Sequence, residues 1–284
     1  MQVRRIGDVQ VSAIGLGGMP LSIEGRPDEA RSIATIHAAL DAGITFIDTA
    51  DAYHLHAGEV GHNETLIAKA LAGYGGDTSG VLVATKGGHL RPGDGSWTKN
   101  GSPDYLKRAC EASLKRLGVD AIGLYQFHRP DPAVPYAESV GALRDLLDEG
   151  KIRMAGVSNA NPEQIRLAGE VLGGRLASVQ NQFSPRFRSS EPELELCDRL
   201  GIAFLPWSPL GGISRAADLG SAHEPFARVA AAHGVSPQQV CLAWMLAKSE
   251  RVVPIPGSSR PETIRDSAAA VDLVLTPEEL ATLG

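Results

Sequence analysis

The sequence predicts a (β/α)8 TIM barrel with an N-terminal β-hairpin and extra C-terminal helices. Short apolar runs alternate with segments of helical periodicity along all 284 residues, which is typical of parallel strands with helices outside. Eight strand-then-helix units within about 250 residues match the size of a closed barrel. No change in composition marks a linker, so we expect a single barrel domain spanning residues 1–284. A doubly wound open sheet is the alternative.

The strands are expected where apolar runs stop at polar or glycine-rich turns. A hairpin over residues 3–6 and 10–16, joined at Gly7-Asp8, leads into the first barrel strand. That strand ends in glycines, but Pro20 takes the third glycine position of GxGxxG, so the fingerprint of dinucleotide-binding open sheets is absent. Further strands are expected at residues 44–47, 81–85, 121–127, 152–157, 177–180, 202–205 and 252–255.

Helices are expected between the strands, where apolar residues repeat at helical spacing. Ser102-Pro103 and Asn161-Pro162 each place a capping residue before a proline at the first helical position. A long polar loop with Trp97 is expected at residues 89–101. The expected helices are residues 28–42, 63–71, 103–117, 135–148, one from 162, 193–200, 224–233, 238–248, 261–270 and a terminal turn after 276–277.

Composition excludes several classes of function. A formal charge of −6 argues against nucleic-acid binding, which needs a basic surface. There is no signal peptide and no run of 18 apolar residues, so we expect no membrane association. Cys110, Cys197 and Cys241 have neither metal-type nor redox-type spacing, which favours buried thiols in a reduced, cytoplasmic protein.

The polar residues follow the strands rather than being scattered. Because the carboxyl ends of barrel strands form one face, and that face carries the active site, these residues should lie close together. Tyr53 follows the second strand closely enough to join them. The strand-end residues are Asp48, Lys86, His128, Ser158-Asn159, Gln180, Trp207 and Ser258.

The expected group can carry acid–base chemistry. A tyrosine has an ordinary pKa near 10, and a neighbouring ammonium such as that of Lys86 lowers the pKa of Tyr53 by favouring the phenolate. Asp48 can hold Lys86 in place, and His128 can hydrogen-bond the same substrate oxygen. Together they would protonate an oxyanion that forms from a carbonyl.

Several segments also resemble the aldo-keto reductases, in the correct order and spacing, over residues 3 to 280. The resemblance implies a (β/α)8 barrel that reduces carbonyl compounds with NADPH. It implies that Tyr53 is the proton donor, that Lys86 lowers its pKa, that Asp48 pairs with Lys86, and that His128 orients the carbonyl. The segments are residues 48–53, 84–88, 124–132, 150–159 and 208–210.

The resemblance also implies a cofactor site. Ser158, Asn159 and Gln180 would bind the nicotinamide carboxamide, Trp207 would stack on its ring, and residues 208–211 would pass under the pyrophosphate. The full set of expected cofactor contacts is Gly18, Met19, Asp48, Ser158, Asn159, Gln180, Trp207, Ser208, Leu210, Gly211, Gly257, Ser258, Arg260 and Asp266.

The end of the last strand bears on the choice of cofactor. A helix start after Ser258 offers free N–H groups to a phosphate, and Arg260 offers a fork suited to a 2′-phosphate. Relatives often have lysine where Gly257 stands and arginine where Thr263 stands. We therefore expect NADPH, with NADH possible. Asp266 matches an acidic position that contacts the adenine in relatives.

Substrate and alternatives remain open. Met19, His54, His56 and Trp97 could form the wall of a pocket for a small-molecule carbonyl substrate. His54, His56 and His62 also resemble a metal cluster, but HxH lies in a loop rather than at a strand end, so we expect no metal. The alternatives to a reductase are a regulatory barrel that binds the cofactor without significant turnover and a metal-dependent barrel hydrolase. We expect a monomer with an open pocket for small or aromatic aldehydes.

Overall fold

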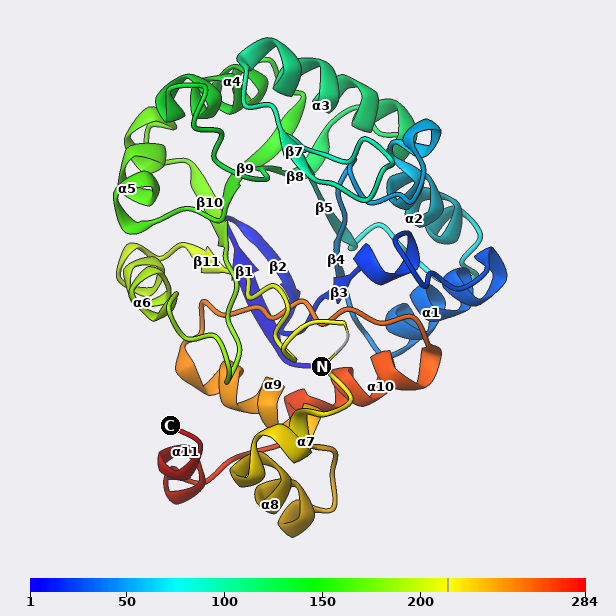
Figure 1. The fold of residues 1–284 in the computed structure, drawn as a ribbon, viewed down its shortest axis with the longest axis vertical. Coiled ribbons are helices and arrows are strands. Elements are labelled where there is room, and N and C mark those ends of the chain that lie inside the picture. Colours follow the sequence, from blue (N-terminus) through cyan, green and yellow to red (C-terminus); the bar gives the residue numbers. More distant parts are fainter. Residues whose placement is uncertain (214) are drawn as a thin grey trace.

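The computed structural model describes residues 1–213 and 215–284, and its centre is a ring of parallel strands surrounded by helices (Figure 1). Seven strands hydrogen-bond in the order β11-β10-β9-β8-β5-β4-β3, and every pair in this sheet is parallel. Their bounds are β3 Leu16–Gly17, β4 Phe46–Asp48, β5 Leu82–Gly87, β8 Ile122–Phe127, β9 Ile152–Ser158, β10 Leu176–Gln180 and β11 Ala203–Phe204.

The segment of residues 252–257 closes the ring between β11 and β3. Phe204 pairs with Val252, and Gly17 pairs with Gly257, both in parallel. The sequence predicts a regular eighth strand here, but Pro254 and Pro256 have no N–H to donate, so only isolated bridges form. Their carbonyls still accept hydrogen bonds from the N–H groups of Gly15 and Gly17 at 2.9 and 3.0 Å. The predicted barrel is confirmed, and the alternative of an open sheet is wrong.

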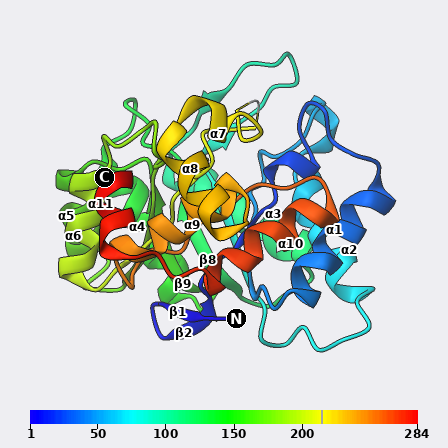
Figure 2. The same cartoon turned by 90° about the horizontal axis from the view of Figure 1, so that it is seen from below.

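The N-terminal hairpin covers the end of the barrel opposite the long loops (Figure 2). It consists of β1 (Val3–Ile6) and β2 (Val9–Ser12), which pair antiparallel around Gly7 at φ 57°. Ile6 and Val11 are buried and pack with residues inside the barrel such as Phe46 and Leu124. The hairpin therefore closes the lower end of the barrel, so that only the other end is open.

The helices lie outside the strands, as the apolar periodicity predicts. The side chains of Asn161 and Ser236 cap α5 and α9, whereas the hydroxyl of Ser102 donates to Asn100 and makes no capping bond. Helices α7, α8 and α11 lie together outside the ring (Figure 1). The bounds are α1 Glu29–Asp41, α2 His62–Ala72, α3 Pro103–Leu117, α4 Tyr136–Asp148, α5 Pro162–Val171, α6 Glu191–Leu200, α7 Leu219–Ala222, α8 Glu224–His233, α9 Pro237–Lys248, α10 Pro261–Ala269 and α11 Pro277–Leu283, with 3-10 turns at Met19–Leu21, Ala57–Glu59 and Ala270–Asp272. None of these helices is long and apolar enough to cross a membrane, within the described part of the chain.

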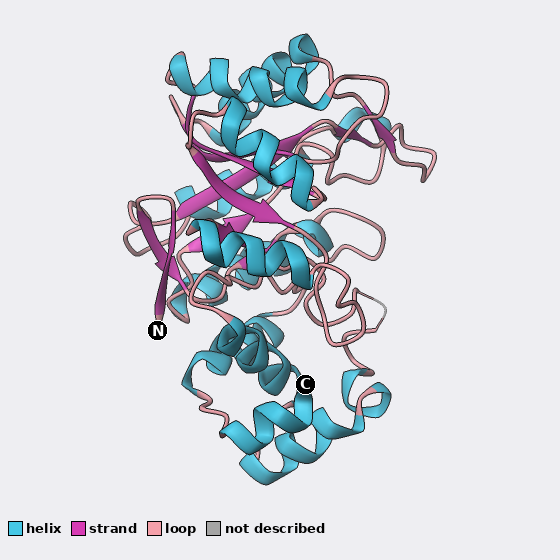
Figure 3. Ribbon diagram, turned by 90° about the vertical axis from the view of Figure 1, so that its left-hand side faces the viewer, coloured by secondary structure: helices cyan, strands magenta, loops and turns pink. Residues whose placement is uncertain are grey.

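The segment expected to be a loop at residues 89–101 contains a small antiparallel hairpin. Strands β6 (His89–Leu90) and β7 (Thr98–Lys99) place His89 opposite Lys99. Two-residue strands in a run rich in glycine and proline give no periodic signal, so the sequence did not predict them. The hairpin stands out from the end of the barrel where the strands finish (Figure 3).

The close contact at Gly17 gives a first testable prediction. A Cβ atom added there would lie 2.8 Å from the carbonyl oxygen of Ile255, which is backbone and cannot rotate away. We expect Gly17→Ala to lower the free energy of unfolding by about 1–3 kcal/mol, measured by urea denaturation. Gly80→Ala is the control, since a Cβ there meets nothing within 4 Å. Equal stability of the two variants would contradict the account of barrel closure.

Candidate active site

A cavity of about 590 Å³ opens at the end of the barrel where the strands finish. This volume lies within the range of small-molecule sites. The side chains expected from the sequence come to it from most of the strands. Those that line it are Met19, Asp48, Tyr53, Trp97, His128, Ser158, Asn159, Gln180, Trp207, Ser208, Leu210 and Gly257.

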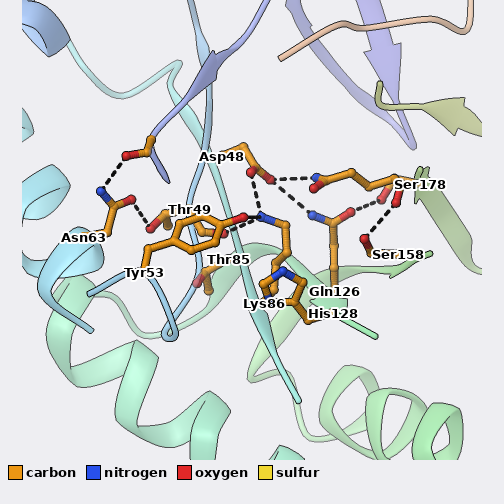
Figure 4. A network of polar contacts seen from close by, with 12 residues as sticks. Asp48, Thr49, Tyr53, Asn63, Thr85, Lys86, Gln126, His128, Ser158 and Ser178 are labelled. Atoms are coloured by element: carbon orange, nitrogen blue, oxygen red, sulfur yellow. Dashed lines mark hydrogen bonds and ion pairs between the residues drawn. The ribbon is translucent and has the colours of Figure 1, made fainter. Parts of the chain in front are cut away.

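A buried ammonium group lies at the base of the cavity. The Nζ atom of Lys86 donates to Asp48 Oδ2 at 2.6 Å, to the carbonyl of Thr49 at 2.8 Å and to the Tyr53 hydroxyl oxygen at 3.1 Å (Figure 4). The side chain of Lys86 is 0% exposed and that of Asp48 3%. Three oxygen partners satisfy the three N–H donors of the ammonium, which allows it to remain charged out of water.

Burial and charge act in opposite directions on Tyr53. Burial raises the pKa of the Tyr53 phenol above its usual value, and the ammonium of Lys86 opposes this rise. Lys86 acts in the predicted direction, but desolvation of the phenolate outweighs it in the folded chain, so the net pKa is raised. Burial alone would lower the pKa of Lys86, but Asp48 and Tyr53 raise it on balance, so the lysine keeps its proton.

His128 lies beside Tyr53. The two ring centroids are 5.8 Å apart, with the rings at 83° to each other. Burial is the main reason that the pKa of His128 lies well below its usual range, and the charge of Lys86 is the second reason. The imidazole is therefore neutral at physiological pH, and its Nδ1 atom has no hydrogen-bond partner within residues 1–213 and 215–284. A neutral imidazole can polarise a carbonyl without competing with Lys86 for the proton.

Two glutamines lie at the Asp48 oxygen that does not contact Lys86. Gln180 Nε2 donates to Asp48 Oδ1 at 2.8 Å, and Gln126 Nε2 lies 3.5 Å from the same oxygen. Gln126 is held in turn by Ser178, whose hydroxyl donates to it at 3.2 Å. The sequence analysis missed Gln126 and Ser178, although each is a polar residue within an otherwise apolar strand, which is the signal that could have identified them.

Asn159 joins three strand ends. Its Nδ2 donates to the carbonyl of His128 at 3.0 Å, and its Oδ1 accepts from Trp207 Nε1 at 3.2 Å. Asn159 has φ 57° and Ser208 has φ 50°, and in the described chain no other residue except glycine has a positive φ. Backbone strain of this kind concentrates at functional sites, where the surrounding structure enforces it.

Several expected cofactor residues lie outside this cavity lining. Gly18 accepts from Asn63 Nδ2 at 2.8 Å, and Gly211 lines a smaller neighbouring hollow. Arg260 is exposed at the start of α10, with Glu262 3.6 Å away, and the hydroxyl of Ser258 donates to the Arg260 carbonyl at 2.8 Å. Asp266 differs most from expectation, because Gln239 and Ser236 donate to its two oxygens at 2.6 and 2.7 Å. Its carboxylate therefore holds α10 against the start of α9.

The loop histidines do not form the expected pocket wall. His54 is buried, its Nδ1 donates to the carbonyl of His56 at 2.8 Å, and its own carbonyl accepts from Arg91 at 2.6 Å. It thus lies behind the wall and fixes Arg91, while Trp97 and Met19 line the cavity. His62 Nδ1 lies 2.8 Å from Ser22 Oγ. Among the described residues, no three His, Cys, Asp or Glu side chains are grouped so that they could hold a metal ion.

A second buried polar cluster, which was not predicted from the sequence, is centred on Glu64. Glu64 is fully buried, accepts from Arg116 Nε at 2.6 Å and accepts from Thr85 Oγ1 at 2.5 Å. Asp51 is also buried, and its Oδ1 atom has no partner in the described part of the chain. Burial, followed by the negative charge of Glu64, raises the pKa of Asp51 to about 8.

The comparisons with known proteins agree with this architecture. The model described as "Aldo/keto reductase family" matches residues 13–284. An uncharacterized oxidoreductase of Schizosaccharomyces pombe is 34% identical over 98% of this chain and 88% of its own length. A probable aldo-keto reductase of Glycine max is 34% identical over 95% of this chain and 84% of its own length.

Solved structures give the same result. An aldo/keto reductase from Klebsiella pneumoniae in complex with NADP and acetate has a TM-score of 0.82 and 31% identity, over 99% of this chain and 93% of that one. The glycerol dehydrogenase of Gluconobacter oxydans has a TM-score of 0.84 and 28% identity, over the same shares. The fold and the family match together define a barrel oxidoreductase of the NAD(P)H-dependent class. The chain belongs to the aldo/keto reductase family.

The raised pKa of Asp51 predicts how stability depends on pH. The unfolded carboxyl titrates near pH 4, whereas in the folded state its pKa is about 8. The folded state thus keeps a proton that the unfolded state releases, so this group's contribution to stability falls between about pH 4 and pH 8 and is constant above. The slope is at most about 1.4 kcal/mol per pH unit.

We expect Asp51→Asn to remove this dependence. The measurement is the Tm of wild type minus that of the variant, which should decrease from pH 5 to pH 8 and then level off. Asp120→Asn is the control, since Asp120 is exposed. A difference in Tm that stays constant with pH would show that Asp51 is ionised in the folded protein.

Proposed function

We propose that the protein transfers a hydride from NADPH to the carbonyl of a small aldehyde or ketone, with Tyr53 as the proton donor. The observation that carries this proposal is the contact of one buried ammonium, Lys86 Nζ, with both Asp48 and the Tyr53 hydroxyl at the base of a cavity. The family match supports the reaction class.

The chemistry of the cavity fits a nicotinamide dinucleotide. Trp207 offers a flat ring on the lining, and Ser158, Asn159 and Gln180 bring hydroxyl and amide groups beside it. The loop of residues 208–212 and the helix start at Arg260 would hold the phosphates. When bound, the cofactor supplies the hydride. The relative crystallised with NADP supports NADPH as the cofactor, and NADH remains the second candidate because Gly257 and Thr263 offer no charge.

Tyr53 and His128 would position the substrate. Both line the cavity, and their hydrogen-bonding groups can converge on one carbonyl oxygen. When the carbonyl carbon accepts a hydride, the Tyr53 hydroxyl would give its proton to the carbonyl oxygen, so that the product is an alcohol. Neutral His128 can hydrogen-bond the developing oxyanion, which lowers the barrier without a net change in its own protonation.

Lys86 would act after the proton has left. A tyrosinate at the base of a buried site is unfavourable by itself, but an ammonium 3.1 Å from its oxygen compensates the charge. Asp48 and Thr49 keep this ammonium in place through both protonation states. Tyr53 then recovers a proton from water at the open mouth of the cavity.

We further propose that the chain works as a single-domain monomer in the cytoplasm. All three cysteines are free and buried, which fits a reducing compartment. The substrate cavity is open, which favours small or aromatic carbonyl compounds over one rigidly matched substrate.

The role of Tyr53 is tested by Tyr53→Phe. The variant keeps the ring but loses the proton, so we expect kcat for reduction of small aldehydes to fall by about 10²- to 10⁴-fold. Binding of NADPH, followed by titration of tryptophan fluorescence, should remain within about twofold of wild type. Unchanged turnover in Tyr53→Phe would overturn the mechanism. Tight NADPH binding by the wild type without turnover of any carbonyl would instead favour the regulatory alternative.

Arg260 tests the choice of cofactor. Because a guanidinium can bind a 2′-phosphate through two parallel hydrogen bonds, Arg260→Ala should raise KM for NADPH about tenfold and leave KM for NADH nearly unchanged. The exposed Arg166→Ala on α5 is the matched control and should change neither value. Equal losses with NADPH and NADH would show that Arg260 does not contact the 2′-phosphate.

A further inference from the structure

The charged side chains on the cavity lining do not balance. The lining contains Glu24, Asp48, Lys99 and Arg129. Both carboxylates are paired, since Asp48 contacts Lys86 and Glu24 contacts Arg91. Neither Arg129 nor Lys99 has a carboxylate within 4 Å among residues 1–213 and 215–284. Backbone hydrogen bonds lower the pKa of the Asp131 carboxyl and the nearby charge of Lys99 lowers it further, but Asp131 does not line the cavity. The lining therefore has an excess of positive charge, and Arg129 is the cation without a carboxylate partner.

Arg129 lies next to the reacting group. It directly follows His128, so the two Cα atoms are about 3.8 Å apart. Its guanidinium carbon lies 5.9 Å from the ring centroid of Trp207, and the side chain is only partly exposed. Burial lowers the pKa of Arg129, while the nearby Tyr53 raises it. A partly desolvated guanidinium without a counter-charge is unfavourable, and binding an anion removes that cost.

The small hairpin brings the second cation and an aromatic wall. Lys99 on β7 lies opposite His89 on β6, and Trp97 stacks on His89 with centroids 4.6 Å apart. His89 in turn lies edge-on to His128 at 4.9 Å. Burial, followed by the charges of Arg129 and Lys99, lowers the pKa of His89 to about 4, so this ring is neutral. This part of the wall is thus flat and uncharged.

We propose that this chamber selects carbonyl substrates that carry a carboxylate, with Arg129 as the anchor and Lys99 as a second positive charge. A planar guanidinium fork matches a carboxylate, and the flat surface of the stacked Trp97 and His89 pair favours a flat substrate lying against it. The proposal rests on carbonyl reduction as the function of the site. Arg129 is assigned to the substrate rather than to the cofactor because it adjoins His128, whereas residues 208–212 and Arg260 are available for the phosphates.

The test compares two para-substituted benzaldehydes of similar size. 4-Carboxybenzaldehyde carries the anion, and methyl 4-formylbenzoate is its uncharged counterpart. The ester withdraws electrons more strongly than the carboxylate, so a preference for the carboxylate runs against intrinsic reactivity. The measurement is the ratio of their kcat/KM values with NADPH. We expect wild type to favour the carboxylate at least tenfold, and Arg129→Leu to reduce the ratio by about 10- to 100-fold.

Three further arms sharpen the test. Arg129→Lys, which keeps the charge but loses the fork, should give an intermediate ratio. Arg166→Leu, an exposed arginine on α5, should leave the ratio at its wild-type value. Benzoate binding, followed by tryptophan fluorescence, should weaken about tenfold in Arg129→Leu, and this readout needs no turnover.

The outcomes separate the two proposals. Turnover of both aldehydes with a ratio near one, or a ratio unchanged in Arg129→Leu, would overturn the carboxylate site while leaving carbonyl reduction intact. A rise in KM for NADPH as large as the loss for the carboxylate substrate would assign Arg129 to the cofactor and also overturn it. If neither aldehyde is reduced but benzoate binding depends on Arg129, the reductase proposal fails and the anion site stands.

Discussion

The buried ammonium of Lys86 is the group on which the rest of the site depends. Removing a charge from water costs several kcal/mol unless oxygen atoms replace its hydration shell. Asp48, the carbonyl of Thr49 and the hydroxyl of Tyr53 do so at 2.6 to 3.1 Å. Asp48 then needs its own donors, which Gln180 and the neighbouring Gln126 provide. One buried cation therefore explains polar residues on four strands of the barrel, β4, β5, β8 and β10.

This network requires a closed barrel. Lys86, Asp48 and Gln180 come from β5, β4 and β10, which reach one another only because the sheet curves around a common axis. The two prolines of residues 252–257 cannot donate hydrogen bonds to a neighbouring strand, but their carbonyls accept hydrogen bonds from Gly15 and Gly17. The hairpin at the N-terminus covers the opposite end (Figure 2). Water and ligands thus enter from the side that has the polar residues.

The substrate side of the cavity differs chemically from its base. At the base the ammonium of Lys86 is paired with the carboxylate of Asp48. This pairing suits proton transfer, because the charges at the base are the same before and after each catalytic cycle. At the mouth Arg129 has no carboxylate within 4 Å in the described chain, and Trp97 and His89 stack on each other in the same lining. The mouth of such a cavity distinguishes substrates by their charge. The base would contact only the carbonyl group, so it would not distinguish between the substituents on that group.

The sequence alone predicted the barrel, the strand ends and the proximity of Asp48, Tyr53 and Lys86, because alternation and strand-end polarity are local patterns. Tertiary structure decided what the pattern cannot contain. Asp266 looked like a cofactor contact, but it holds α10 to α9, since helix packing sets where its carboxylate points. His54 looked like a pocket wall, but it lies behind one. The direction of the pKa shift of Tyr53 also depends on tertiary structure. Desolvation raises this pKa and the charge of Lys86 lowers it, and both the burial of Tyr53 and its distance from Lys86 are set only by the folded chain.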